Sequence, residues 1–153
     1  MSLPAKKSNP WRKRLLIGGL ALIILCAGVY WYYATEKYGD TKNVKADFTV
    51  DATTFIKEFI ADDSAANKKY TDKIVTLTGT VSEIEAADTT LNIKFIDSTT
   101  GSYAIFAFQQ QHLAEAKSVK PGDRISVKGS CSGGIYSEIL EATSISFKRS
   151  TLN

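Results

Sequence analysis

Residues 74–84 read IVTLTGTVSEI, and this stretch decides the fold. Apolar side chains alternate with threonines along it, and Val75, Leu77 and Val81 fall on one face. Such alternation predicts a strand with one buried face, because successive side chains of a strand point to opposite sides of the sheet. Gly79 lies in the middle, where a missing side chain indicates a bend or the close approach of another element. We therefore expect a bent first strand in which Gly79 serves the backbone and not a ligand.

The period of two continues downstream, interrupted by one helix-favouring stretch at residues 110–117, QQHLAEAK. We expect further strands over residues 91–97, 102–109, 124–130 and 138–147, with Gly133-Gly134 turning the chain into the last. Three strands, a helix and two strands is the order of the OB-fold, a five-stranded Greek-key barrel. A β-sandwich would need about seven strands. The prediction is a mainly β domain, a five-stranded OB-fold Greek-key barrel with a helix between strands three and four.

A short helix is predicted ahead of the first strand. Asp51 can cap its N-terminus, and Val50 and Phe55 have the spacing of a hydrophobic staple. Phe55 and Phe59 belong to an apolar stripe at helical spacing. The outward face of strands two and three is also apolar for an exposed surface, so either a ligand binds there or this helix covers it. We favour coverage by the Phe55/Phe59 helix, because its stripe must pack within the same domain.

Residues 15–33, LLIGGLALIILCAGVYWYY, contain no charged residue. Five basic residues precede them: Lys6, Lys7, Arg12, Lys13 and Arg14. The stretch is long enough, at ~28 Å as a helix, to cross a hydrocarbon core of roughly 30 Å, and the basic flank is expected to stay in the cytoplasm. A cleaved signal peptide and a lipoprotein lipidated at Cys26 are the alternatives. The first fits less well because the apolar run continues beyond residue 28, and the second because Leu25 precedes the cysteine.

These features predict four segments in the chain. Residues 1–14 are a basic cytoplasmic tail, residues 15–33 an uncleaved transmembrane signal-anchor helix in contact with the lipid bilayer, residues 34–50 a linker, and residues 51–153 the OB-fold domain. Beyond residue 33 the chain holds 14 basic and 16 acidic residues, so the overall charge of +3 comes from the N-terminal segment. The basic excess therefore indicates targeting rather than nucleic-acid binding.

The outward face of strands two and three provides the candidate ligand-binding residues Lys94, Tyr103 and Ile105. Single-stranded nucleic acid needs a positively charged groove with aromatic platforms, and one lysine with one tyrosine supplies little of either. We expect an envelope protein or a small molecule as the ligand and do not expect nucleic acid. The alternative is that a nucleic acid or an oligosaccharide binds through the same face.

The sequence contains no pattern that indicates catalysis. The single histidine, His112, has no nucleophile or acid near it in sequence and is expected at the surface, while Glu83 and Glu85 are expected to be solvated at a strand end. Cys131 alternates with Val127 and is expected to point inward. No phosphate-binding, dinucleotide-binding or Cys-x-x-Cys pattern occurs. We expect no enzymatic activity, no catalytic residue, no cofactor and no metal site.

Two motifs carry a resemblance: Tyr70-x-x-Lys73-x-Val75-x-Leu77-x-Gly79-x-Val81 and Pro121-Gly122-Asp123-x-Ile125-x-Val127-Lys128-Gly129-x-Cys131-x-Gly133. Together they resemble the tRNA-anti-like OB-fold domain family of bacterial envelope proteins, most of unassigned function. The resemblance implies an OB domain behind a lipoprotein signal or membrane anchor, and the family name records a fold relationship rather than tRNA binding. Together with the uncharged stretch and its basic flank, it predicts a single-pass protein of the bacterial inner membrane, with the N-terminus cytoplasmic and the domain periplasmic.

The resemblance also bears on two further features. Family members often have a second cysteine in the last strand, where this chain has Thr143-Ser144, so an intradomain disulfide is not expected. A membrane-anchored OB domain is similar to the haem chaperones of cytochrome maturation, which attach haem through a histidine near the C-terminal edge of the barrel. No histidine follows His112 in this chain, and that function is rejected.

Overall fold

The structure is a computed structural model that describes residues 10–34 and 39–153. The chain forms two compact units, one ending at Tyr38 and the other spanning Gly39–Asn153. Residues 1–9 of the expected cytoplasmic tail and residues 35–38 of the expected linker lie outside the described residues.

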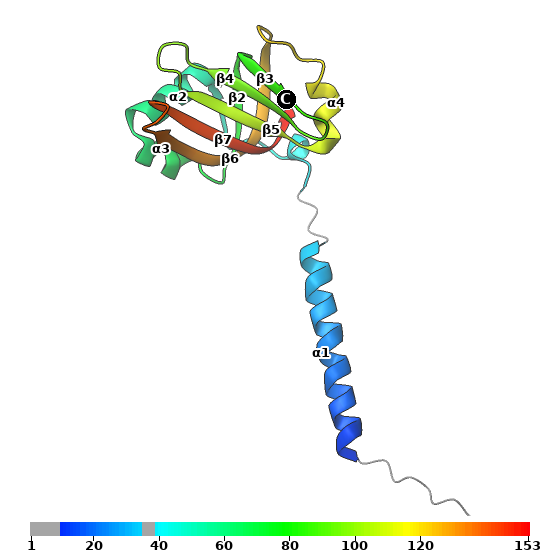
Figure 1. Cartoon of the computed structure of the whole chain (residues 1–153). Helices are drawn as coiled ribbons and strands as arrows, with labels where there is room; N and C mark the ends of the chain where they lie inside the picture. The colour runs from blue at the N-terminus through cyan, green and yellow to red at the C-terminus, as the bar shows by residue number, and fades with distance from the viewer. Residues whose placement is uncertain (1–9, 35–38) are drawn as a thin grey trace, which may run out of the picture. The chain divides into compact units, whose positions relative to one another are not determined.

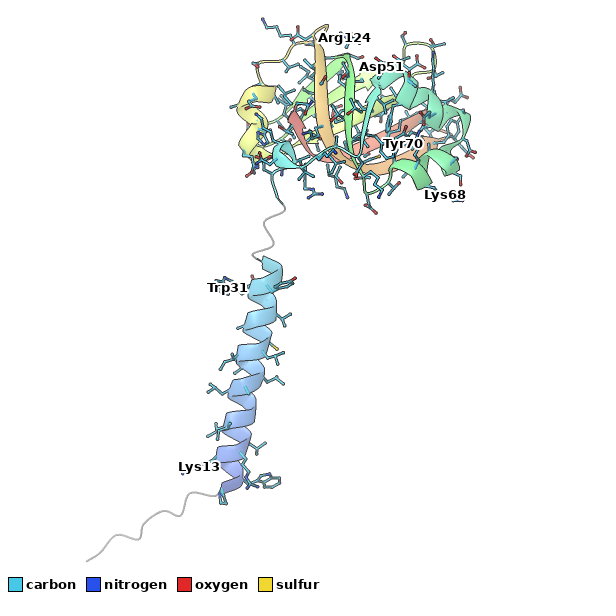
Figure 2. All side chains as sticks on the ribbon, turned by 180° about the vertical axis from the view of Figure 1, so that it is seen from behind. Lys13, Trp31, Asp51, Lys68, Tyr70 and Arg124 are labelled. Carbon is cyan, nitrogen blue, oxygen red and sulfur yellow. The ribbon has the colours of Figure 1, made fainter. Side chains whose placement is uncertain are left out.

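The first unit contains one helix, α1 (Pro10–Ala34), which is 25 residues long. Its Lys13–Tyr32 part, with a mean hydropathy of 2.1, is long and apolar enough to cross a membrane. Figure 2 shows side chains projecting around α1 between Lys13 and Trp31, and its large apolar side chains are exposed. This helix is consistent with the expected membrane anchor and equally with a signal sequence.

The second unit is mainly β. Its strands are β1 (Phe48–Asp51), β2 (Ile74–Thr80), β3 (Glu83–Ala86), β4 (Leu91–Ile96), β5 (Tyr103–Phe108), β6 (Arg124–Ser137) and β7 (Ala142–Leu152). Its helices are α2 (Ala52–Ala61), α3 (Asp63–Tyr70) and α4 (Leu113–Ala116), with short 3-10 turns at Thr41–Asn43 and Gln110–His112. Helices α2 and α3 lie toward one end of the strands and α4 toward the other (Figure 1).

The seven strands form one sheet in the order β1-β2-β6-β7-β5-β4-β3. This order agrees with an OB-like fold, because β2 and β3 are two halves of the bent first strand predicted over residues 74–84. Between them Val81 N donates to Asp123 O on the side of β6, and Ser82 N donates to Lys94 O on β4. The prediction of a closed five-stranded barrel is wrong in two respects: the described unit has seven strands, and the hydrogen-bonded sheet stays open, with β1 and β3 as its two edge strands.

The predicted turn at Gly133-Gly134 is also wrong. Both glycines lie inside β6, and the chain turns instead between Ser137 and Ala142. Gly133 has a φ of +99° where the register of β6 against β7 shifts, which identifies a β-bulge. A Cβ on Gly134 would lie 2.6 Å from Cδ1 of Phe59. The two glycines therefore accommodate a bulge and a closely packed helix rather than a chain reversal.

The core is an aromatic cluster that joins α2 and α3 to the inner side of the sheet. The Phe55 ring centroid lies 4.7 Å from that of Tyr70 and 5.6 Å from that of Phe147, and Phe147 in turn stacks on Phe106 at 4.4 Å. Each such side chain, once fully buried, contributes about 1.5–3 kcal/mol through the hydrophobic effect. The predicted cap at Asp51 is confirmed, since its side chain accepts from Thr53 N, and Asp62 caps α3 by accepting from Ala65 N.

The predicted linker is too long at its C-terminal end, because residues 40–50 are part of the folded unit. β1 pairs in parallel with β2, with Val50 opposite Leu77. Thr41 is buried, and Lys128 Nζ donates to the carbonyl oxygens of Lys42 and Val44. This segment is ordered by long-range contacts that its polar sequence does not indicate.

Candidate functional site

The three residues predicted to bind a ligand lie together on the outward face of β4 and β5. Lys94 is opposite Ile105 in the antiparallel register, and Tyr103 is opposite Ile96 two pairs further along, on the same face. Lys94 Nζ lies 5.4 Å from the centroid of the Tyr103 ring. Strand alternation places the opposite side chains, such as Phe95, in the core. The structure thus forms one small surface, the outer strip, from Ile96, Tyr103, Ile105 and Lys94.

Glutamates of β3 neutralise the lysine of this strip. Lys94 Nζ pairs with Glu83 at 3.3 Å and makes a short ion pair with Glu85, while only 15% of the Lys94 side chain is exposed. The hydrogen bond from Lys94 lowers the pKa of the Glu85 carboxyl, and the same bond raises the pKa of Lys94. The two glutamates were expected to be merely solvated. Their i, i+2 spacing places both on one face of β3, and this was the available signal that they face Lys94.

The outer strip continues across the sheet. Tyr103 of β5 is opposite Ser144 of β7, and Ser144 is opposite Ile135 of β6. Ile135 is 74% exposed and Ile96 is 36% exposed. A row of side chains without charge, most of them apolar, therefore crosses four strands.

Helix α2 does not cover this strip, so the expected coverage by the Phe55/Phe59 helix is wrong. Phe55 and Phe59 are fully buried against Tyr70, and Phe55 also contacts the inward-facing Phe147. The helix follows the inner side of the sheet because the large inward residues there provide more apolar surface than the outer strip does. The outer strip is left partly exposed.

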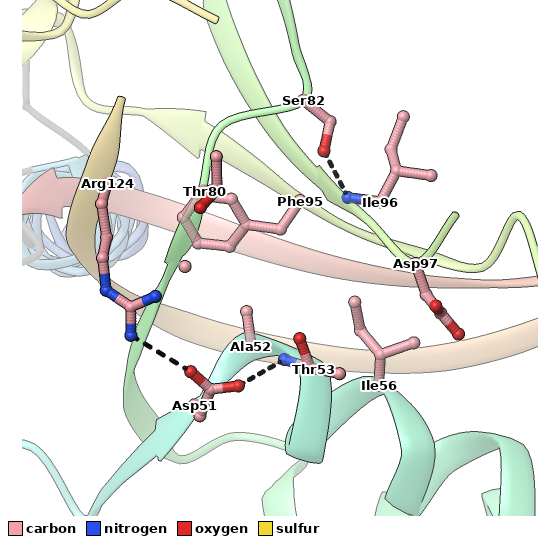
Figure 3. A pocket seen from close by; sticks show the side chains of 11 residues that line it. Asp51, Ala52, Thr53, Ile56, Thr80, Ser82, Phe95, Ile96, Asp97 and Arg124 are labelled. Atoms are coloured by element: carbon pink, nitrogen blue, oxygen red, sulfur yellow. Dashed lines mark hydrogen bonds and ion pairs between the residues drawn. The ribbon is translucent and has the colours of Figure 1, made fainter. Parts of the chain in front are cut away.

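A cavity of about 160 Å³ lies beside one end of the strip, between the start of α2 and the junction of β2 and β3. Figure 3 shows the Arg124 guanidinium pointing to Asp51, with the two groups 3.6 Å apart. Asp51 also caps α2, and Ser82 Oγ accepts from Ile96 N. The backbone N–H of Thr99 lowers the pKa of Asp97, which also lines the cavity. These polar groups are engaged with one another, so the cavity resembles a structural junction more than a reaction centre.

His112 is buried, contrary to the expected surface position. Its Nε2 lies 2.7 Å from Asp40 Oδ1, and its side chain is 8% exposed. The hydrogen bond from His112 is the main reason that the pKa of Asp40 is lowered. Asp40 lies 72 positions earlier in the chain, so no local pattern reveals the pair. The contact helps to fix residues 40–44 on the domain.

Cys131 is fully buried, as predicted. Burial raises the pKa of its thiol to about 11, so the thiol is protonated and a poor nucleophile at neutral pH. Among the described residues no group of three or more histidine, cysteine, aspartate or glutamate side chains could hold a metal ion.

Comparison with known proteins agrees with this OB-like architecture. The family model tRNA_anti-like matches residues 6–142. The chain belongs to the tRNA-anti-like family, as its sequence motifs suggest. No curated protein matches the chain.

Solved structures give one alignment of use. A "putative nucleic acid-binding lipoprotein" from Klebsiella pneumoniae subsp. pneumoniae aligns with a TM-score of 0.53 at 13% identity, over 68% of this chain and 90% of that one. This likeness concerns the fold alone.

Two other structures align less well. The Stn1-Ten1 complex of S. pombe gives a TM-score of 0.35 at 13% identity, over 52% of this chain and 57% of that one. The asparaginyl-tRNA synthetase of Entamoeba histolytica gives 0.38 at 15% identity, over 53% and 20%. At these TM-scores neither alignment supports an inference.

Proposed function

We propose that this chain is a single-pass membrane protein of the bacterial envelope whose OB-fold domain is a non-catalytic binding module outside the cytoplasm. The uncharged stretch of residues 15–33, the aromatic residues at its C-terminal end and the basic flank support an uncleaved anchor with a cytoplasmic N-terminus. A cleaved signal and a lipidated Cys26 are the competing processing routes. Intact-mass measurement of the membrane-extracted protein separates all three, and a chain that begins at Val29 or at a lipidated Cys26 would contradict the anchor.

The ligand, on this proposal, is a protein or a small molecule that contacts the outer strip. One observation carries it: the only cation of the strip, Lys94, is paired with Glu83 and Glu85 and flanked by Ile96, Tyr103 and Ile105. A surface of this kind attracts apolar and hydrogen-bonding groups, whereas a phosphate would compete with two carboxylates for one ammonium. Burial of His112 and Cys131, the residues best suited to base or nucleophile chemistry, supports a binding role rather than a catalytic one.

Nucleic-acid binding is the second candidate. The name of the Klebsiella lipoprotein favours it. The charge of the folded unit does not, since residues 39–153 contain 13 basic and 15 acidic residues, a net charge of −2. Most of the affinity of proteins for nucleic acid without sequence preference comes from phosphate neutralisation, and this surface offers little of it.

Titration of the full-length protein with single-stranded DNA and RNA oligonucleotides at low salt tests the two candidates. We expect the oligonucleotides either not to bind or to bind without a steep loss of affinity as the salt concentration rises. The double variant Glu83→Gln/Glu85→Gln is the matched comparison, because it removes both carboxylates beside Lys94 without shortening a side chain. Tight, salt-sensitive binding by the unmodified chain would establish the nucleic-acid function and contradict the proposal.

A further inference from the structure

The hairpin between β6 and β7 extends past its neighbouring strands. β2 pairs with β6 only as far as Ser130, and β5 pairs with β7 only from Tyr103–Ser144 onward. The end of the hairpin carries large apolar side chains in the open: Tyr136 is 52% exposed, Leu140 64% and Ile139 94%. Contiguous exposed apolar side chains on a folded domain indicate an interaction surface.

A pocket connects this hairpin to the α2–α3 junction. Its volume is about 360 Å³, and Phe59, Ile60 and Tyr136 form its apolar lining while Asp62 and Asp63 line its acidic part. Ile60 is itself 41% exposed. Tyr136 follows Ile135 in β6, so alternation turns it away from the outer strip and toward the helices. The pocket is therefore a different surface from the outer strip.

The charged residues that line this pocket, Asp62 and Asp63, are both acidic. Residues 59–67 and 134–144, which form the α2–α3 junction and the end of the hairpin, contain the four carboxylates Asp62, Asp63, Glu138 and Glu141 and no lysine, arginine or histidine. Glutamates on both sides of Ile139-Leu140 bring two of these charges next to the apolar tip. We use the name hairpin surface for the apolar residues Ile60, Tyr136, Ile139 and Leu140 together with the four carboxylates.

We propose that the hairpin surface is a docking site for a basic, partly apolar segment of a partner protein. A lysine or arginine stem fits against Tyr136 and Ile60 with its charged end at Asp62 or Asp63, while neighbouring apolar side chains contact Ile139 and Leu140. Charge complementarity selects this occupant. A second copy would bring like charges together, and the carboxylates disfavour contact with an anionic membrane surface.

Selection of peptides from a random phage-displayed library tests this, with the full-length protein in zwitterionic nanodiscs as bait and empty nanodiscs as counter-selection. We expect the enriched peptides to combine lysine or arginine with leucine, isoleucine or an aromatic residue. Synthetic copies should bind the Glu138→Gln/Glu141→Gln variant and the Tyr136→Ser variant about tenfold or more weakly. The glutamine variant changes only exposed carboxylates, so its fold is expected to persist even where Tyr136→Ser perturbs packing.

Ile96→Ser in the outer strip is the matched control and should leave peptide binding unchanged, so the two surfaces are tested separately. Enrichment of peptides without basic residues, equal binding to the glutamine variant, or no enrichment would overturn the proposal. A photo-crosslinking residue at position 139 in membranes of the native host gives the second readout. Products that join two copies of this chain, or this chain to lipid, would each contradict a basic protein partner.

Discussion

Gly79 and Ala52 offer a quantitative test of how the bent first strand meets α2. A Cβ on Gly79 would lie 2.7 Å from Cβ of Ala52 and 3.4 Å from Cδ2 of Phe95. Carbon atoms pack best at about 3.5–4.0 Å, so the start of α2 would have to move by roughly 1 Å. The Ala52 methyl cannot rotate away, because it is fixed to the helix backbone. We expect Gly79→Ala to lower the free energy of unfolding by about 1–3 kcal/mol, as overpacking usually does, and Gly79→Val to lower it further.

The reciprocal change supplies the check. Ala52→Gly removes the opposing methyl group and by itself should cost about 0.5–1 kcal/mol, the usual penalty for glycine in a helix. The clash is absent in the double variant Gly79→Ala/Ala52→Gly. We therefore expect its free energy of unfolding to be about 1–2 kcal/mol higher than the sum of the two single losses predicts.

Urea denaturation of residues 39–153 measures all four corners of this cycle. Gly39→Ala is the control, since among the described residues, its chain neighbours aside, no atom lies within 4 Å of the position its Cβ would take, and it should change stability by less than about 0.5 kcal/mol. Additive costs in the double variant, or an unchanged midpoint for Gly79→Ala, would refute the close approach of β2 and α2.

Three further results are expected. Because burial raises the pKa of Cys131 to about 11, its thiol should resist alkylation in the native protein and the domain should run as a monomer on non-reducing gels; rapid native labelling would contradict this. The pKa of Asp40 is lowered from its ordinary value of 3.8 by His112, so the stability it contributes is present above that value and lost as the pH falls through the folded pKa. Asp40→Asn should therefore make stability fall less as the pH is lowered, which denaturation at a series of pH values measures. An unchanged fall in stability would exclude the Asp40–His112 pair as its cause. Ser150 Oγ is buried with no hydrogen-bond partner in the described part of the chain, so Ser150→Ala should leave the thermal midpoint unchanged or raise it, by up to about 1 kcal/mol in stability, whereas a clear loss would reveal a partner.

Local patterns predicted those features whose causes are local. Alternating side chains located the start of β2 and both ends of β4 and β5 to within one residue, and the capping residue Asp51 located the start of α2. The inward position of Cys131 followed from the same alternation. In each case the residues that determine the structure are neighbours in the sequence.

The errors arose where a distant residue determines the structure. Gly133-Gly134 reads as a turn, but these glycines make room for a bulge and for Phe59 of α2. β1 has only four residues and depends on its parallel partner β2.

The same limit affected the candidate site. Lys94, Tyr103 and Ile105 were correctly placed on one face, but the neutralisation of Lys94 requires the pairing of β3 with β4. The burial of His112 likewise depends on Asp40, which sequence reasoning assigned to a linker.

Site-specific photo-crosslinking at Ile105, in the full-length protein within membranes of the native host, identifies directly what binds the outer strip. Ile105 lies in the outer strip opposite Lys94, so a ligand bound there is within reach of the probe. We expect adducts with a protein or a small molecule that are lost when Tyr103→Ser and Ile96→Ser are combined. Adducts with nucleic acid alone, or no adduct other than with lipid, would contradict this expectation.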